Sequence, residues 1–141
     1  LEMEFRPPGV EDEDRTNFFV IQAYLNEGPL GITAEMLAEG CVDSTCGSKH
    51  TIANDNQTFA SPVVEGQSYH MKIEHLGNGV IDITLDGNET LSLDLSPITG
   101  FASTEFSAVR LRTTSRGTDT PGEEVFVRAL FDNISVGTQT P

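Results

Sequence analysis

An exposed aromatic ring with polar neighbours is the feature of this chain that best fits a binding function. A sugar ring stacks its C–H face on a flat aromatic side chain, while amide and guanidinium groups bind its hydroxyls. The chain has no Trp and only two tyrosines, and Tyr69 belongs to an apolar face, so Tyr24 is the ring that we expect in a site. The polar residues expected beside it, as a glycan platform, are Gln22, Arg110, Arg112 and Arg128. The alternative is that these arginines pair with carboxylates on an acidic surface.

Residue patterns of established catalytic sites are missing from the sequence. The histidines do not have metal-ligand spacing, no serine lies in a Gly-x-Ser-x-Gly elbow, and the phosphate-binding glycine patterns are absent. Glu74 and Asp82 face outward across a predicted hairpin, but opposed like charges are unfavourable, so we interpret them as solvated surface residues. The sequence therefore favours a binding protein over an enzyme.

The two cysteines, Cys41 and Cys46, lie in one loop-like segment, GCVDSTCGS. Their spacing is not that of a zinc-binding pair, and no second pair exists to complete four ligands. We predict a local disulfide, with free thiols as the alternative. A disulfide indicates an oxidising compartment, so the expected location is extracellular or periplasmic.

The net charge is −14, from 22 acidic and 8 basic residues, and the sequence pI is near 4.3. Binding to nucleic acid requires clustered Lys and Arg, so this composition argues against nucleic-acid partners and against anionic lipid. No apolar run approaches the roughly 18 residues that a membrane helix requires, so membrane insertion is not expected either.

The alternating stretch over residues 66–87 is the element around which the other strands are expected to assemble. Apolar residues occupy every second position on both sides of Gly77-Asn78-Gly79, a sequence that reaches positive φ easily and turns a hairpin. Asp86-Gly87-Asn88 then leads into a third alternating run over residues 91–95. The pattern predicts a three-stranded antiparallel meander.

Further short runs predict an all-β fold, an antiparallel two-sheet β-sandwich. Residues 31–37 are rich in helix formers, but their position after a turn at residues 26–29 favours a return strand. The other predicted strands are a short edge strand at residues 3–5, then residues 18–25, 50–52, a segment near Phe59, residues 106–112 and residues 124–136. The predicted core residues are Tyr69, Met71, Ile73, Ile81, Ile83, Leu85, Val109, Leu111, Val127 and Phe131.

The predicted organisation is one sandwich domain with short flanking segments. Residues 1–16 are expected to be an acidic segment or edge strand, residues 17–137 the domain, and residues 138–141 a tail. The acidic run at residues 11–14 is expected to be an exposed loop.

Two motifs resemble the concanavalin A-like lectin/glucanase superfamily, which includes the laminin-G-like jelly rolls. The first is YHMKIE at residues 69–74, followed after the turn by ITLDG at residues 83–87. The second is ALFDNISV at residues 129–136, which is similar to a closing strand of that superfamily. The resemblance implies a jelly roll and a non-catalytic, secreted carbohydrate-binding or adhesion module.

The resemblance also implies a metal site and two alternative functions. In glucanase-like members, the Asp of the closing strand commonly binds structural calcium, which in this chain would be Asp132, helped by residues 11–14 or by Glu4. Glucanases carry an E-x-D-x-x-E strand that this chain lacks; the nearest candidate is Glu123-Glu124. One alternative is therefore a degenerate glycoside hydrolase-like domain. The other is a structural protein-interaction domain that forms a homodimer through a sheet edge.

Overall fold

The computed structural model describes residues 1–11, 13–28 and 30–111. Contacts divide the chain into a unit of Leu1–Arg110 and a second unit of Leu111–Pro141. The first unit contains all the described elements: β1 (Glu2–Arg6), β2 (Phe19–Gly28), β3 (Gly31–Gly40), β4 (Asn56–Thr58), β5 (Met71–His75), β6 (Val80–Leu85), β7 (Glu89–Asp94), the 3-10 turn η1 (Phe101–Ser103) and β8 (Glu105–Arg110). Within the described residues no helix is long and apolar enough to cross a membrane.

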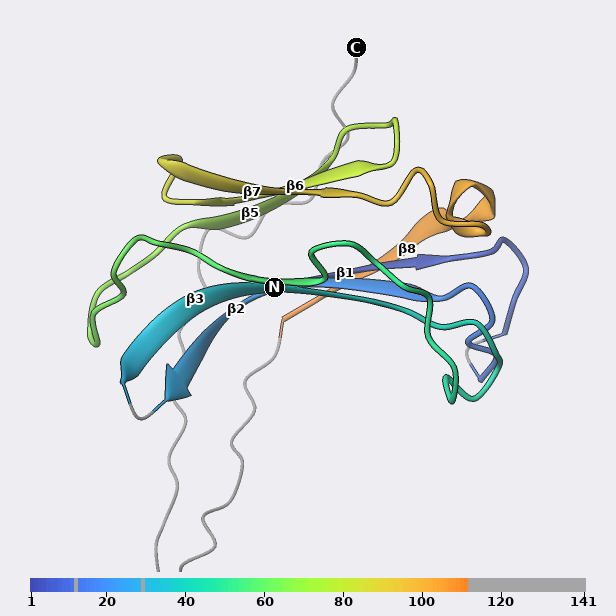
Figure 1. Cartoon of the computed structure of the whole chain (residues 1–141), viewed down its shortest axis with the longest axis horizontal. Coiled ribbons are helices and arrows are strands. Elements are labelled where there is room, and N and C mark those ends of the chain that lie inside the picture. Colours follow the sequence, from blue (N-terminus) through green and yellow to red (C-terminus); the bar gives the residue numbers. More distant parts are fainter. Residues whose placement is uncertain (12, 29, 112–141) are drawn as a thin grey trace, which may run out of the picture. The chain divides into compact units, whose positions relative to one another are not determined.

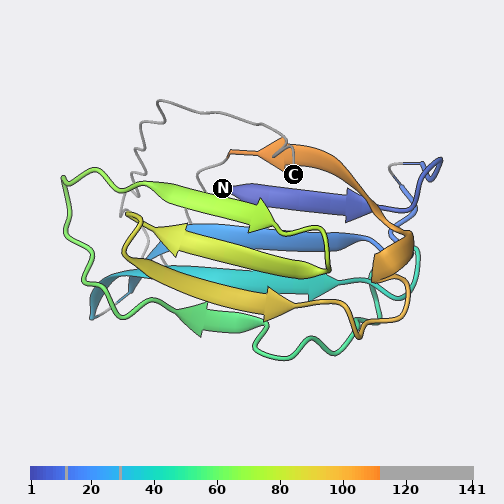
Figure 2. The same cartoon turned by 90° about the horizontal axis from the view of Figure 1, so that it is seen from above.

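The described strands form two antiparallel sheets that face each other (Figure 1). The larger sheet has the order β4-β3-β2-β1-β8, and the smaller sheet is the predicted meander β5-β6-β7. Figure 2 shows the smaller sheet stacked over the larger one, with the strands of both running in roughly the same direction. The predicted all-β, two-sheet antiparallel sandwich is confirmed at this level, whereas the jelly-roll connection of the strands stays a prediction.

The N-terminal strand is the largest departure from the predicted arrangement of strands. β1 pairs with β2 on one side and with β8 on the other, so it lies inside the sheet and not at its edge as predicted. Met3 and Phe5 face the smaller sheet, where Phe5 belongs to the core. The predicted domain, residues 17–137, stays a prediction because residues 112–137 lie outside the described ones.

The core lies between the two sheets and follows the period of two that the sequence shows. On β2, Phe19, Ile21 and Ala23 are buried, and on β6, Ile81 and Ile83 have no exposed surface. The other predicted core residues differ in their outcome. Leu85 is buried, and three residues pack against the core while partly exposed: Tyr69, Met71 and Ile73. Val127 and Phe131 lie outside the described residues. Val109 and Leu111 are half-buried and do not belong to the core cluster. Placing Val109 and Leu111 in the core was therefore wrong.

The residues at the turns of the meander have the backbone conformations that the sequence predicts. Gly77 and Gly79 have φ values of 78° and 87°. A Cβ on Gly79 would also lie 2.9 Å from the Ser96 side chain. Both its positive φ and this close contact therefore disfavour any other residue at this position. Asp86 and Gly87 both have positive φ at the second turn.

The segment with helix-forming composition is a strand, as predicted. β3 pairs with β2 over its whole length, from Phe19 opposite Gly40 to Gly28 opposite Gly31. The alternation of buried Ala34, Met36 and Ala38 on β3 outweighs its helical propensity, because burying one face stabilises a strand more than propensity destabilises it.

The predicted strand at residues 50–52 was wrong. In this region only Lys49 forms a bridge, an isolated one with Cys41, and His50 instead stacks on the Phe19 ring with centroids 5.3 Å apart. Gly40 makes room for that stack, because a Cβ there would lie 2.6 Å from the Phe19 ring. The strand predicted near Phe59 is β4, which ends one residue before it.

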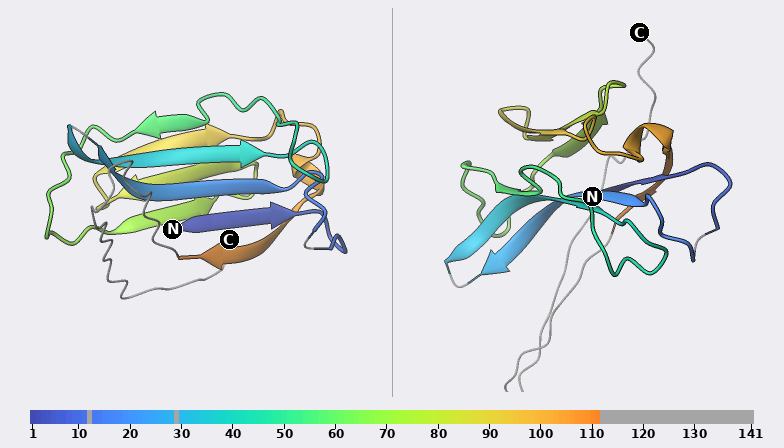
Figure 3. Two further views of the ribbon diagram at one scale, coloured as in Figure 1. Left: turned by 90° about the horizontal axis from the view of Figure 1, so that it is seen from below. Right: turned by 45° about the vertical axis from the view of Figure 1, so that its right-hand side comes forward.

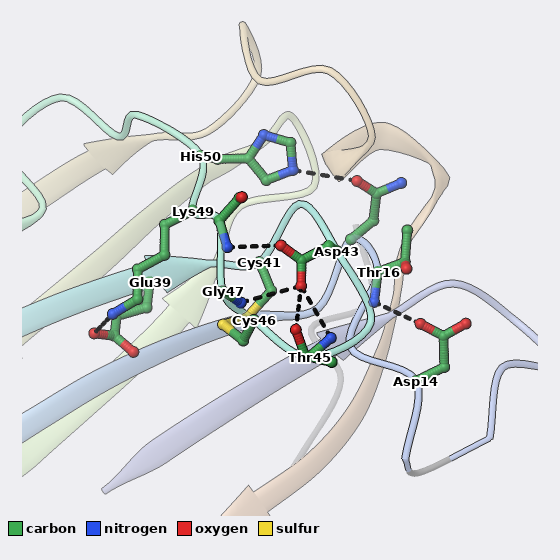
Figure 4. The surroundings of a disulfide bond; sticks show 12 residues. Asp14, Thr16, Glu39, Cys41, Asp43, Thr45, Cys46, Gly47, Lys49 and His50 are labelled. Atoms are coloured by element: carbon green, nitrogen blue, oxygen red, sulfur yellow. Dashed lines mark hydrogen bonds and ion pairs between the residues drawn. A yellow bond between two sulfur atoms is a disulfide. The ribbon is translucent and has the colours of Figure 1, made fainter.

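Cys41 and Cys46 form the predicted disulfide, with Cα atoms 4.8 Å apart (Figure 4). Asp43 organises the loop that the disulfide closes. Its carboxylate accepts hydrogen bonds from the Thr45 hydroxyl at 2.7 Å and from the backbone N–H groups of Gly47 and Ser48 at 3.0 and 2.6 Å. These hydrogen bonds, that from Thr45 first, hold the pKa of Asp43 well below its ordinary value.

Replacing Ile83 by Ala tests the assignment of the core. Ile83 is fully buried at the centre of β6, so the change should lower the free energy of unfolding by about 2–5 kcal/mol in urea titrations. Leu30→Ala, at a fully exposed turn position, is the matched control and should change it by less than about 0.5 kcal/mol. Similar small losses for both variants would contradict this core.

Thiol titration tests the disulfide in solution. Under denaturing, non-reducing conditions the unmodified protein should show no free thiol, and the reduced protein should show the thiols of Cys41 and Cys46. Because the closed ring is short, reduction should cost only about 2 kcal/mol or less of stability in the chain-entropy account. Free thiols in the unreduced protein would contradict the assignment.

Candidate functional site

The outer face of the larger sheet, which points away from the core, brings together those predicted ligand-binding residues that the structure describes. Burial of Phe19, Ile21 and Ala23 places Gln22 and Tyr24 on this face. Glu2 lies opposite Gln22 on one side and opposite Arg110 on the other, so the three form a row across β2, β1 and β8. Figure 3 (left) shows this face of the sheet. Tyr24 follows two residues along β2.

Tyr24 belongs to a hydrogen-bonded cluster that spans the β2–β3 hairpin, which we call the Tyr24 cluster: Tyr24, Asn26, Thr33 and Glu35. Register creates it, because Tyr24 lies opposite Glu35 and Asn26 lies opposite Thr33 on the same face. Tyr24 donates its hydroxyl proton to Glu35 Oε2 at 2.7 Å. Thr33 Oγ1 and Asn26 Nδ2 donate to Glu35 Oε1 at 2.7 and 3.1 Å.

The three donors stabilise the ionised form of Glu35. Partial burial by itself would raise the pKa of Glu35, but the hydrogen bonds from Thr33, Tyr24 and Asn26 outweigh it and hold the pKa below its ordinary value. Glu35 is therefore an ionised acceptor at neutral pH, fixed in position by its neighbours.

The cluster keeps hydrogen-bonding capacity for a ligand. A carboxylate has about four acceptor positions, of which three are used in the cluster, and the remaining one is on Oε2. Asn26 is exposed and uses one amide N–H, which leaves its carbonyl oxygen and its second N–H directed to solvent. A half-buried tyrosine ring, an amide and an oriented carboxylate are thus presented together on a rigid hairpin.

Gln22 and Arg110 are held by acidic neighbours on β1. Gln22 Nε2 donates to the Glu2 carboxylate. Glu4, with only 1% of its surface exposed, forms an ion pair with Arg110 Nε at 2.9 Å and another with Arg6 at 3.6 Å. Arg110 therefore pairs with a carboxylate, which was the alternative to its role in a glycan platform. Arg110 also lines a surface hollow of about 390 Å³ beside β8.

The remaining predicted site residues are Arg112, Arg128 and Asp132, and they lie outside the described residues. The described part of the chain contains no group of three or more His, Cys, Asp or Glu placed to hold a metal ion. Glu4, one of the two groups named as possible helpers of Asp132, forms ion pairs with Arg6 and Arg110. Calcium at Asp132 stays a prediction.

A second hollow, also of about 390 Å³, lies at one end of the sandwich. Phe5, His75, Phe101 and Phe106 line it with edge-to-face ring contacts, such as Phe5–Phe101 with centroids 5.4 Å apart. Burial lowers the pKa of His75 below its ordinary value. Asn78, Ser96 and Thr104 also line this hollow, but no hydrogen-bonded cluster on a carboxylate like that of Glu35 lies among its lining residues.

Three members of the Tyr24 cluster, Asn26, Thr33 and Glu35, were not predicted from the sequence. Asn26 had been assigned to a turn, but the strands continue to Gly28 and Gly31. The signal was present in the two glycines, which mark the hairpin end and fix the register from which the opposed pairs follow.

The pH dependence of stability tests the Tyr24 cluster without any ligand. Because the folded-state pKa of Glu35 is lowered, its contribution to stability should be complete above the ordinary value of 4.5 and be lost as the pH falls through the folded-state pKa. The difference in melting temperature between wild type and Glu35→Gln should therefore shrink from about pH 6 to about pH 3. Tyr24→Phe, which removes one of three donors, should reproduce part of this effect. A difference that does not vary with pH would contradict the cluster.

Comparison with known proteins assigns no family to the chain. No protein-family model matches it, and neither a curated protein nor a solved structure is significantly similar to it. The resemblance to the concanavalin A-like superfamily therefore stays a prediction. What this surface does has to be inferred from its own residues.

Proposed function

We propose that this protein is a secreted, non-catalytic carbohydrate-binding or adhesion module, and that the Tyr24 cluster is its glycan platform. The observation that carries the proposal is the arrangement of Tyr24, Asn26 and Glu35 on one face of a fully paired hairpin. An aromatic face, an amide and an oriented acceptor are the groups that a sugar ring and its hydroxyls require. They are already ordered by hydrogen bonds with one another, which lowers the entropic cost of binding.

The charge of the protein points to neutral polysaccharides as the ligand class. Each molecule carries a net charge of −14, and the cluster itself contains an ionised carboxylate. Uronate-rich or sulfated polysaccharides would be repelled at long range and at the site. A neutral sugar can instead donate a hydroxyl proton to Glu35 and accept a hydrogen bond from Asn26.

The chemistry of Glu35 supports binding over hydrolysis. A glycosidase needs a protonated carboxylic acid as a proton donor, with a raised pKa, and a second carboxylate on the other side of the scissile bond. The pKa of Glu35 is lowered, and three of the roughly four acceptor positions on its carboxylate are occupied by donors of the cluster. A degenerate glycoside hydrolase-like domain remains the alternative, distinguished by hydrolysis products.

The disulfide supports a location outside the reducing cytoplasm. A disulfide between Cys41 and Cys46 persists in oxidising compartments, where surface polysaccharides also occur. An extracellular or periplasmic location is part of the proposal on this ground.

Binding of the full chain to neutral oligosaccharides tests the proposed function. Xylohexaose, cellohexaose and mannohexaose are suitable probes, with titration calorimetry as the measurement. For the probe that binds, Tyr24→Ala should weaken binding at least about tenfold, since stacking and hydrogen bonding are lost together. Tyr24→Phe, which keeps the ring, should weaken it less.

The matched control is Phe106→Ala, which removes a half-exposed ring from a different part of the first unit. It should leave sugar binding unchanged. Equal loss from both variants, or binding that Tyr24→Ala leaves intact, would show that the Tyr24 cluster is not the platform. Release of shorter sugars from any probe would favour the hydrolase alternative.

A further inference from the structure

β8 forms one margin of the larger sheet, and its backbone there is irregular. Among the described strands, β1 is its only neighbour. The register shifts between Glu4 and Phe5, which lie opposite Ala108 and Phe106, so Ser107 is an extra residue. Such a β-bulge changes which backbone N–H and C=O groups of β8 face away from β1, toward the position of a further strand.

The hydrogen bonds of β1 show which backbone groups of β8 point outward. Leu1 and Ala23 exchange hydrogen bonds at 2.8 Å, so the odd-numbered residues of β1 bond to β2 and the even-numbered ones bond to β8. Glu4 and Arg6 are therefore bonded to Ala108 and Glu105. The Ser107 hydroxyl donates to the Glu4 carbonyl at 3.2 Å, which confirms the direction of that carbonyl.

It follows that the N–H and C=O groups of Phe106 and Val109 point away from β1. In a regular strand, the backbone N–H and C=O groups of residues three apart point to opposite sides of the strand. The extra residue at Ser107 places these groups of Phe106 and Val109 on the same side. They lie opposite Phe5 and Met3, which are two residues apart on β1. Their outward groups therefore have the spacing of consecutive bonded pairs in an ordinary antiparallel ladder.

We propose that β8 pairs antiparallel with β8 of a second copy of this chain, about a two-fold axis between Ser107 and Ala108. In this register Phe106 of each copy lies opposite Val109 of the other, and both pairs form hydrogen bonds. Ser107 and Ala108, two small residues, face each other at the axis. The two larger sheets join into one, and the edge that β8 presents disappears.

The side chains complement each other in the same register. Phe106 and Val109 lie on the inner face, opposite Phe5 and Met3, and the Phe106 ring is 48% exposed. Val109 of the second copy would cover that ring, an aromatic–β-branched pair. On the outer face, Glu105 of each copy lies opposite Arg110 of the other, and 55% of the Arg110 side chain is exposed beyond its ion pair with Glu4. Apolar residues meet on one face and opposite charges on the other.

Concentration-dependent sedimentation of the full chain tests this dimer. A six-residue strand buries less surface than stable interfaces do, so we expect a monomer–dimer equilibrium between about 1 μM and 1 mM. The buffer should contain at least about 0.15 M salt, because two molecules of net charge −14 repel each other. A monomer over the whole concentration range would overturn the proposal.

Val109→Pro removes one outward N–H group without removing a hydrogen bond to β1. It should raise the dissociation constant at least about tenfold while the circular dichroism of the monomer stays unchanged. Met71→Pro is the matched control. The backbone N–H of Leu76 bonds to Val80, and that of Asp86 bonds to His70, so the even-numbered residues of this segment face β6. Met71, an odd-numbered residue of β5, therefore points its N–H away from β6. A dimer that Val109→Pro leaves intact uses another surface.

Glu105→Arg provides a second test that does not depend on a proline. It places an arginine opposite Arg110 of the second copy and should weaken the dimer at least about tenfold. Glu27→Arg makes the same change in net charge at an exposed position of β2. Because it lowers the overall repulsion, it should leave the dimer as stable as wild type or more stable. Equal effects of the two variants would overturn the register. The Tyr24 cluster is not involved, so failure of the dimer is independent of the proposed function.

Discussion

Burial of Phe19, Ile21 and Ala23 against the smaller sheet fixes the side of the larger sheet on which every other residue of β2 lies. A strand has a period of two, so a shift by one residue would expose these three side chains and bury Gln22 and Tyr24. The hydrophobic effect therefore sets the register of the hairpin, and the register in turn places Tyr24 opposite Glu35. The polar surface is a consequence of how the core packs.

The same constraint acts on β1, with a different result. Phe5 belongs to the core, so Glu2 and Glu4 lie on the outer face, where they are nonetheless almost fully buried. A buried carboxylate needs charged or hydrogen-bonding partners, and Gln22, Arg6 and Arg110 supply them. The row of polar residues across β2, β1 and β8 is therefore largely occupied by its own contacts. The Tyr24 cluster, at the more exposed end of the hairpin, keeps unused capacity.

The sequence predicted those elements whose signal is local. The meander follows from alternation and from turn residues such as Gly77, Gly79 and Asp86, and each lies where expected. The position of β1 inside the sheet depends on pairing with β8, about a hundred residues later, and no local pattern contains that information. For the same reason the sequence identified Tyr24 but not Glu35, since their contact depends on where the hairpin turns. His50 was predicted to lie in a strand, whereas in the structure its ring stacks on Phe19 and hydrogen-bonds to Asn17.

The proposed function depends most directly on the Tyr24 cluster being the surface that meets a sugar. Two-dimensional ¹H–¹⁵N spectra of the full chain, recorded during titration with the oligosaccharide that binds, would test this. We predict that the Asn26 side-chain amide and the backbone amides of Tyr24, Thr33 and Glu35 shift together, with one dissociation constant. Shifts confined to the hollow at Phe5, His75 and Phe106, with the Tyr24 cluster unchanged, would contradict it.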